Sequence, residues 1–125
     1  MTPFGARLRT LRADRGMTMT ELATRLEVTP AYLSALEHGH RGAPSTGLVH
    51  QVCEAFGLIW DEADELNRLA RLSHPRVTVD TAGLSPERTA LANRLAQTIE
   101  RLPDETVAAL HNLLDAALSR KVARR

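Results

Sequence analysis

Residues 17–39 read MTMTELATRLEVTPAYLSALEHG, and this stretch decides the fold. Thr18 with Glu21 three positions later forms a capping box that starts one helix, and Thr29 followed by Pro30 starts a second. A turn of only about three residues joins the two helices. Apolar or small residues stand where two steeply crossing helices would pack together, at Leu22, Ala23, Leu26, Val28, Leu33 and Leu36. The pattern predicts a helix-turn-helix.

Helical periodicity continues on both sides of this stretch. The upstream residues that recur at helical spacing are Phe4, Leu8 and Leu11, which predict a helix over about residues 3–15. Downstream, Ser45 or Thr46 caps a helix that Gly57 closes, and a fifth helix begins at or just before Asp61. We expect the buried positions of this fifth helix to be Trp60, Ala63, Leu66, Leu69, Ala70 and Leu72.

The last third of the chain has a different organisation. Residues 76–83 are expected to be extended and could form a brief strand, because Val77 and Val79 alternate with polar neighbours. Ser85 with Pro86 starts a sixth helix, and Pro103 with Asp104 starts a seventh. We therefore predict a domain over residues 1–74, an extended linker over 75–85, and a C-terminal helical hairpin over 86–125.

Composition supports an all-α protein and excludes several classes. Hydrophobic residues make up 43% of the 125 residues, enough for a core, whereas aromatic residues make up only 3%. The single Cys53 cannot form an internal disulfide, and no secretory or membrane-spanning apolar run is present, so we expect a cytoplasmic protein. The net charge of +1 is uninformative, but arginines crowd the first third, which predicts that this third faces nucleic acid.

Three segments, FGARLRTLRADRG, MTMTELATRLEVTPAYLSALEHG and PSTGLVHQVCEAFGL, resemble the phage repressor and Cro family of helix-turn-helix regulators. The resemblance covers about Phe4 to Leu72, and its most distinctive pieces are the ELA start, VTPAYLSALE and the following HG. It implies a five-helix, lambda-repressor-like bundle whose reading head runs from about Met19 to Glu37. The helix from Thr29 to Glu37 would enter the major groove of DNA, and the helix before it would cross the phosphate backbone.

The same resemblance implies roles for individual residues. The positions that match the family's base-reading residues are Pro30, Ala31, Tyr32 and Ala35. The positions that match residues contacting phosphate or sugar are Thr18, Met19, Thr29, His38, His40 and Arg41. Arg12 and Glu37 would form a partly buried, structural ion pair. Two positions depart from the family pattern: Glu27 replaces a glycine usual in the turn, and Met19 replaces a frequent glutamine.

The predicted recognition helix has an unusual chemistry. Its exposed N-terminal positions carry no Arg, Lys, Asn or Gln, so strong bidentate contacts to bases are missing. We expect Ala31, Ala35 and the Tyr32 ring to contact thymine methyl groups, a Tyr32 or Ser34 hydroxyl to add one polar contact, and DNA shape to supply the rest.

Other features favour ordinary structural interpretations over chemistry. Cys53 lies on an apolar helix face, as a core thiol does, and the loop histidines lack a matching ligand set with His50, so we expect no metal and no cofactor. The acidic cluster Asp61, Glu62, Asp64 and Glu65 suits a solvated helix N-terminus, and no catalytic constellation is present. The basic end Arg120, Lys121, Arg124 and Arg125 suits a solvated helix C-terminus, or could add phosphate contacts.

The sequence thus predicts a transcriptional regulator that is not an enzyme and that binds double-stranded DNA as a homodimer on an inverted-repeat operator. The apolar stripes of the C-terminal hairpin are the expected dimer surface, with Trp60 and the fifth helix as the alternative. A second hypothesis is an antitoxin-like interaction module that binds a partner protein, through the C-terminal hairpin, and represses its own promoter.

Overall fold

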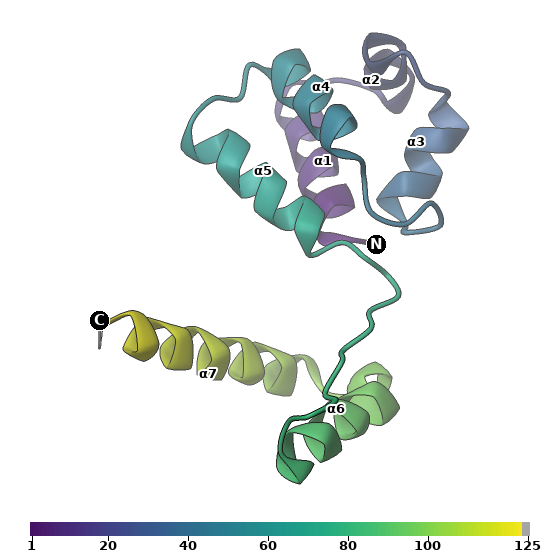
Figure 1. The fold of residues 1–125 in the computed structure, drawn as a ribbon. Helices are drawn as coiled ribbons and strands as arrows, with labels where there is room; N and C mark the ends of the chain where they lie inside the picture. The colour runs from purple at the N-terminus through teal and green to yellow at the C-terminus, as the bar shows by residue number, and fades with distance from the viewer. Residues whose placement is uncertain (124–125) are drawn as a thin grey trace. The chain divides into compact units, whose positions relative to one another are not determined.

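The structure is a computed structural model that describes residues 1–123, and every regular element within them is helical (Figure 1). The elements in chain order are α1 (Pro3–Asp14), α2 (Met19–Leu26), α3 (Pro30–Glu37), α4 (Thr46–Phe56), α5 (Asp61–Arg71), α6 (Pro86–Thr98), the 3-10 turn η1 (Ile99–Arg101) and α7 (Asp104–Ala123). The chain separates into two compact units, Met1–Val77 and Thr78–Arg125. Of the basic C-terminal end, Arg124, Arg125 and the side chains of 120–123 lie outside the described residues.

Side-chain caps explain where most of these helices begin. Each N-cap hydroxyl accepts a hydrogen bond from a backbone N–H three residues further on, which satisfies a donor that the helix itself leaves free. The residues that act in this way are Thr2, Thr18, Thr29, Ser45 and Ser85. The capping residues that the sequence predicted at the starts of α2, α3, α4 and α6 are therefore confirmed.

The first unit is a five-helix bundle around one core (Figure 1). Helix α1 packs against α3 and α5, α2 packs against α3 and α4, and α4 packs against α5. The largest fully buried apolar side chains come from all five helices: Phe4, Leu8, Leu22, Leu33, Leu36, Val49, Val52 and Leu66. Since every helix buries one face against its neighbours, the bundle fixes how α2 and α3 are presented at the surface.

Two expected core positions of the fifth helix are wrong. Trp60 is 81% exposed and Leu72 is 55% exposed. Trp60 precedes the helix with a φ of 52°, so its side chain leaves the direction that helical periodicity predicts. Leu72 lies two residues after buried Ala70, about 200° around the helix axis, and therefore faces solvent. The buried stripe of α5 is Leu66 and Ala70, one turn apart.

The second unit lacks a core of its own. Within residues 78–119 no side chain is buried, and the expected extended segment, residues 76–83, forms no strand. The two expected C-terminal helices are present as α6 and α7. Within residues 78–123, however, α7 does not pack alongside α6, whose closest neighbouring element is the adjoining η1 turn (Figure 1).

Candidate nucleic-acid interface

The turn between α2 and α3 is built on a left-handed residue. Glu27 has φ 58° and ψ 40°, and the backbone N–H of the next residue, Val28, reaches back to the carbonyl of Ala23 at 3.0 Å. A side chain in this conformation costs about 1 kcal/mol relative to glycine. The turn therefore keeps its shape without the glycine, because the packing of α2 on α3 holds it.

The exposed side of α3 carries the residues predicted to read bases. Pro30 and Ala31 are exposed at the first turn of the helix, and Tyr32, Ser34 and Ala35 are half-buried. Thr29 caps this helix by accepting a hydrogen bond from the Tyr32 N–H at 3.0 Å. The cap and the fixed φ of proline together hold the first turn of α3 rigid.

Tyr32 is in contact with the loop that follows α3. The guanidinium carbon of Arg41 lies 5.7 Å from the centre of the Tyr32 ring, within the range of a cation–π interaction. Arg41 is exposed, so its charge stays accessible to a ligand while its position is tied to the ring. The loop thus places a guanidinium beside a helix that has no basic residue of its own.

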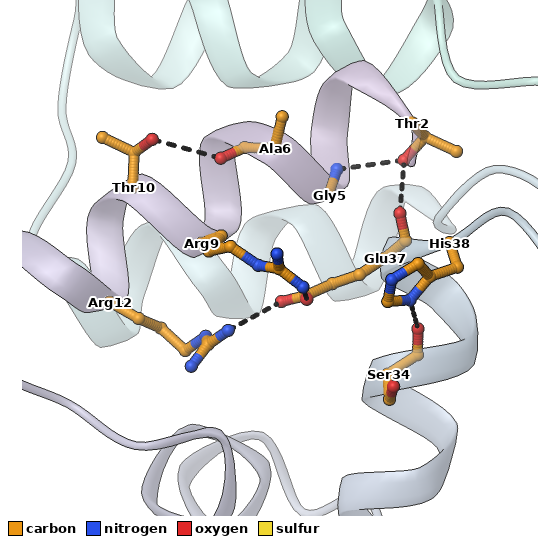
Figure 2. Close-up of polar contacts among 9 residues, drawn as sticks. All are labelled: Thr2, Gly5, Ala6, Arg9, Thr10, Arg12, Ser34, Glu37 and His38. Atoms are coloured by element: carbon orange, nitrogen blue, oxygen red, sulfur yellow. Dashed lines mark hydrogen bonds and ion pairs between the residues drawn. The ribbon is translucent and has the colours of Figure 1, made fainter.

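The other loop and turn residues predicted to meet the DNA backbone occupy defined places. Thr18 both accepts from the Glu21 N–H and donates to its carboxylate, each at 3.1 Å, and Met19 is half-buried. His38 places its Nδ1 2.9 Å from the carbonyl oxygen of Ser34 (Figure 2), and its ring stacks on that of His40 with centres 6.4 Å apart. Both imidazoles are exposed.

An open groove of about 560 Å³ lies between the start of α3 and the start of α4. Thr29 and Tyr32 form one side, and the first turns of α4 contribute Ser45, Gly47 and Gln51. Sequence reasoning missed these last three residues because nothing local marks them. Only the packing of α4 beside the α2 and α3 pair brings the start of α4 next to Tyr32.

Behind this surface, a buried carboxylate anchors the end of α3 to α1. The Glu37 side chain is fully buried, and its Oε2 lies 3.4 Å from Nη2 of Arg12, whose side chain is 13% exposed. Its Oε1 lies 3.6 Å from Nη2 of Arg9, whose side chain is 53% exposed (Figure 2). Within residues 1–123, Glu37 Oε1 and Arg12 Nε have no hydrogen-bond partner. Two arginines of unequal burial therefore share one carboxylate.

A backbone contact completes the junction of α1 and α3. The Thr2 N–H donates to the Glu37 carbonyl oxygen at 3.0 Å. The Thr2 hydroxyl donates to the same carbonyl at 3.4 Å and accepts from the Gly5 N–H at 3.0 Å (Figure 2). A Cβ atom at Gly5 would collide with the Glu37 carbonyl and lie 2.7 Å from its Cα. The close approach of α1 to the end of α3 thus requires glycine, a role that no local sequence pattern indicates.

Most arginines of the first third have partners inside the bundle. Arg15 donates to the Phe56 carbonyl at 3.1 Å and lies over the Phe56 ring, and Arg25 donates to the Ala55 carbonyl at 3.4 Å. These contacts satisfy carbonyls at the C-terminus of α4, where cations are also favoured by the helix dipole. The crowding of arginines therefore reflects helix packing to a large extent, whereas Arg41 lies against Tyr32 on the exposed face of α3.

No group of three or more His, Cys, Asp or Glu within residues 1–123 is placed to hold a metal ion. Burial raises the pKa of the Cys53 thiol, which therefore stays protonated at neutral pH. No helix in this part of the chain has both the length and the apolar character needed to cross a bilayer.

A short α2, a three-residue turn and an exposed, rigidly capped α3, held in a five-helix bundle, define the class of DNA-binding helix-turn-helix domains. The chain belongs to the helix-turn-helix domain family, whose model matches residues 3–69.

The curated relatives are bacterial regulators. The chain is 36% identical over 61 residues to the HTH-type transcriptional repressor RghR of Bacillus subtilis, which is 49% of this chain and 45% of that protein. It is 37% identical over 57 residues to the HTH-type transcriptional regulator RamB of Mycobacterium tuberculosis, which is 46% of this chain and 12% of that protein. The chain thus spans less than half the length of each. Both are named as transcriptional regulators, and no solved structure matches the chain significantly.

Proposed function

We propose that this protein is a sequence-specific transcriptional regulator that binds an inverted-repeat operator as a homodimer. Its membership of the helix-turn-helix family and its similarity to named transcriptional regulators support the DNA-binding part. The observation that carries the proposal is the exposed, rigidly capped face of α3 with Arg41 stacked beside it. One such head covers only a half-site, so two heads are needed for a palindromic operator.

In this proposal α3 enters the major groove with its N-terminal turn towards the bases. Ala31, Ala35 and the Tyr32 ring contact thymine methyl groups, with a hydroxyl of Tyr32 or Ser34 as the polar contact. The short and mostly apolar side chains of this face favour close approach of the helix to the floor of the groove. Specificity then depends strongly on the shape of the operator as well as on base edges.

Contacts to the phosphate backbone surround this reading face. Pro30 belongs with the base-reading residues of α3, and the proposed phosphate or sugar contacts come from Thr18, Met19, Thr29, His38, His40 and Arg41. Arg41 is the strongest of these, because it carries a full charge at neutral pH and its stacking on Tyr32 limits its freedom before binding. The helix that reads the bases and the guanidinium that neutralises a DNA phosphate are thereby held in a fixed position relative to each other.

The test begins with an operator selected from a random duplex library by the full chain. Tyr32→Ala should weaken binding to that operator by about 1–3 kcal/mol, because it removes both the ring and the support of Arg41, and change binding to unrelated duplex much less. Arg41→Ala should weaken both, and should lower the salt dependence of binding by about one phosphate contact. Tyr32→Phe is the matched control that keeps the ring. Equal losses on operator and unrelated duplex for Tyr32→Ala would contradict the proposed reading face.

A further inference from the structure

Helix α6 carries an apolar groove of about 470 Å³. Its base is formed by α6 and its wall by the preceding segment, and the residues that line it are mostly apolar: Val79, Thr81, Leu84, Arg88, Leu91, Ala92, Leu95, Ala96 and Ile99. The wall is held in place by a hydrogen bond of 2.9 Å between the hydroxyls of Thr81 and Thr89, and by a turn in which the Leu84 N–H donates to the Thr81 carbonyl at 3.0 Å. The groove is therefore formed before anything fills it.

The apolar side chains of this groove are unusually exposed for a folded protein. Leu91 is 56% exposed, Ile99 61% and Val79 64%, and no residue of α6 is buried. Covering apolar side chains grouped in this way is favourable in proportion to the area that a partner removes from water. Because α7 of the same chain does not pack along α6, the groove is available to another molecule.

Helix α7 has the complementary shape. Val107, Leu110, Leu114 and Leu118 fall on one stripe of the helix, and Leu114 and Leu118 are each 61% exposed. At 20 residues the helix is about 30 Å long, which is enough to run the length of the 13-residue α6. Each copy of the chain thus has one apolar groove and one apolar ridge, and within the described residues both are left largely exposed, with Val107 and Leu110 half-buried.

Charge favours one pairing of these helices. Residues 86–101 have a net charge of +1, from Arg88, Arg94 and Arg101 against Glu87 and Glu100. Residues 104–123 have a net charge of −1, from Asp104, Glu105 and Asp115 against Arg120 and Lys121, and the three acids all lie in the first twelve residues. Pairing α7 with α7 of a second copy would bring like net charges together, and so would pairing α6 with α6. Pairing α6 with α7 of the second copy brings opposite charges together.

We propose that two copies of this chain form a dimer in which the α6 groove of each copy receives α7 of the other copy. This isologous exchange uses both apolar surfaces of each copy and closes as a two-fold dimer. The inference rests on the proposed homodimer and names its contacts, and it does not depend on how α3 reads DNA.

The test uses cross-linking in the full chain with Cys53→Ala, so that each variant carries one cysteine. Leu95→Cys marks the groove and Leu114→Cys marks the ridge, and one of the two variants carries an affinity tag that changes its mass. When the two are mixed and mildly oxidised, the mixed dimer should exceed either same-variant dimer by on the order of tenfold, because a disulfide needs Cβ atoms about 4 Å apart. Asn112→Cys, on the opposite side of α7 from the ridge, is the matched control and should cross-link only at background level.

A second measurement addresses the charges. Arg88→Glu, at a residue that lines the groove, and Asp115→Arg should each weaken the dimer by about fivefold in sedimentation analysis, and the two together should restore most of the affinity. A chain that is monomeric at micromolar concentration would overturn the proposal, as would a predominance of Leu114→Cys dimers, or cross-linking only within one chain when both cysteines are present. DNA binding is measured on the same samples, so that failure of the exchange and failure of operator binding are told apart.

Discussion

Replacing Arg12 by alanine should destabilise the bundle more than any other single loss of an arginine in it. Glu37 is fully buried, and Arg12, with a side chain only 13% exposed, is its better-sheltered partner at 3.4 Å. Coulomb's law at an effective dielectric of 20 gives an attraction of about 5 kcal/mol at that distance, which the desolvation of both ions largely offsets. What matters is the charge that remains after truncation, since a buried carboxylate without its partner costs about 3–5 kcal/mol.

Because Arg9 is a second partner of Glu37, we expect the cost of Arg12→Ala to lie at the lower end of the range of about 3–5 kcal/mol. Its side chain is 53% exposed and 3.6 Å from Glu37, so it can partly neutralise the carboxylate, but solvent screens the interaction. We therefore expect Arg12→Ala to cost about 3 kcal/mol, or roughly 12–24 °C in Tm for a bundle of this size. Arg9→Ala should cost about 1 kcal/mol or less.

The assay is thermal and urea unfolding followed by circular dichroism at the helix band. Fluorescence is a poor probe here, because the single tryptophan, Trp60, is 81% exposed in the folded state. Arg12→Met should be nearly as damaging as Arg12→Ala, whereas Arg12→Met with Glu37→Met should recover most of the loss, because the buried charge is then gone. The reasoning is refuted if Arg12→Ala shifts Tm by less than about 4 °C, or if the double variant is as unstable as Arg12→Met.

Three further outcomes follow from the structure of the bundle. Gly5→Ala should destabilise the fold by at least about 2 kcal/mol, because its Cβ would meet the backbone of Glu37, whereas Gly47→Ala, in open space on α4, should be neutral or stabilising in the same melts. Glu27→Gly should raise the stability by about 0.5–1 kcal/mol by relieving the left-handed turn, and an unchanged or lower Tm would argue against strain there. Cys53 should react with iodoacetamide on the order of tenfold more slowly in the folded chain than in urea. Its reaction should begin at a more alkaline pH than that of free cysteine, because burial raises the pKa of the thiol. Equal rates in the folded and unfolded chain would show that the thiol is accessible.

The linear sequence is sufficient to predict the helices because their signals are local. A hydroxyl residue followed directly by proline marks where α3 and α6 begin, and Thr18 with Glu21 three positions later marks the start of α2. In the first unit, apolar periodicity marks which side of each helix is buried. The bundle that these helices form was predictable once the spacing of the α2 and α3 apolar residues was recognised. The same reasoning failed at Trp60, because one backbone angle outside the helical range redirects a side chain that periodicity alone would bury.

The sequence predicts which residues of α3 form the candidate site, but it does not predict their contacts with residues of other elements. The face of α3 follows from the helix that carries it. The stacking of Arg41 on Tyr32 and the groove shared with Ser45, Gly47 and Gln51 join separate elements, so no local pattern announces them. The DNA contacts themselves stay predictions, to be tested by the Tyr32 and Arg41 variants.

What the sequence determined by itself is therefore a set of capped, amphipathic helices and the short turn that makes two of them a helix-turn-helix, since these depend on residues within about one turn of one another. Only the tertiary structure decided which partner each charged side chain binds and where two helices approach each other closely. Arg15 and Arg25 reach carbonyls 41 and 30 positions away, and Gly5 lets α1 meet the end of α3. Packing also decided that, in the part of the chain that the structure describes, α6 and α7 bury none of their apolar side chains fully, because burial is a property of neighbours in space.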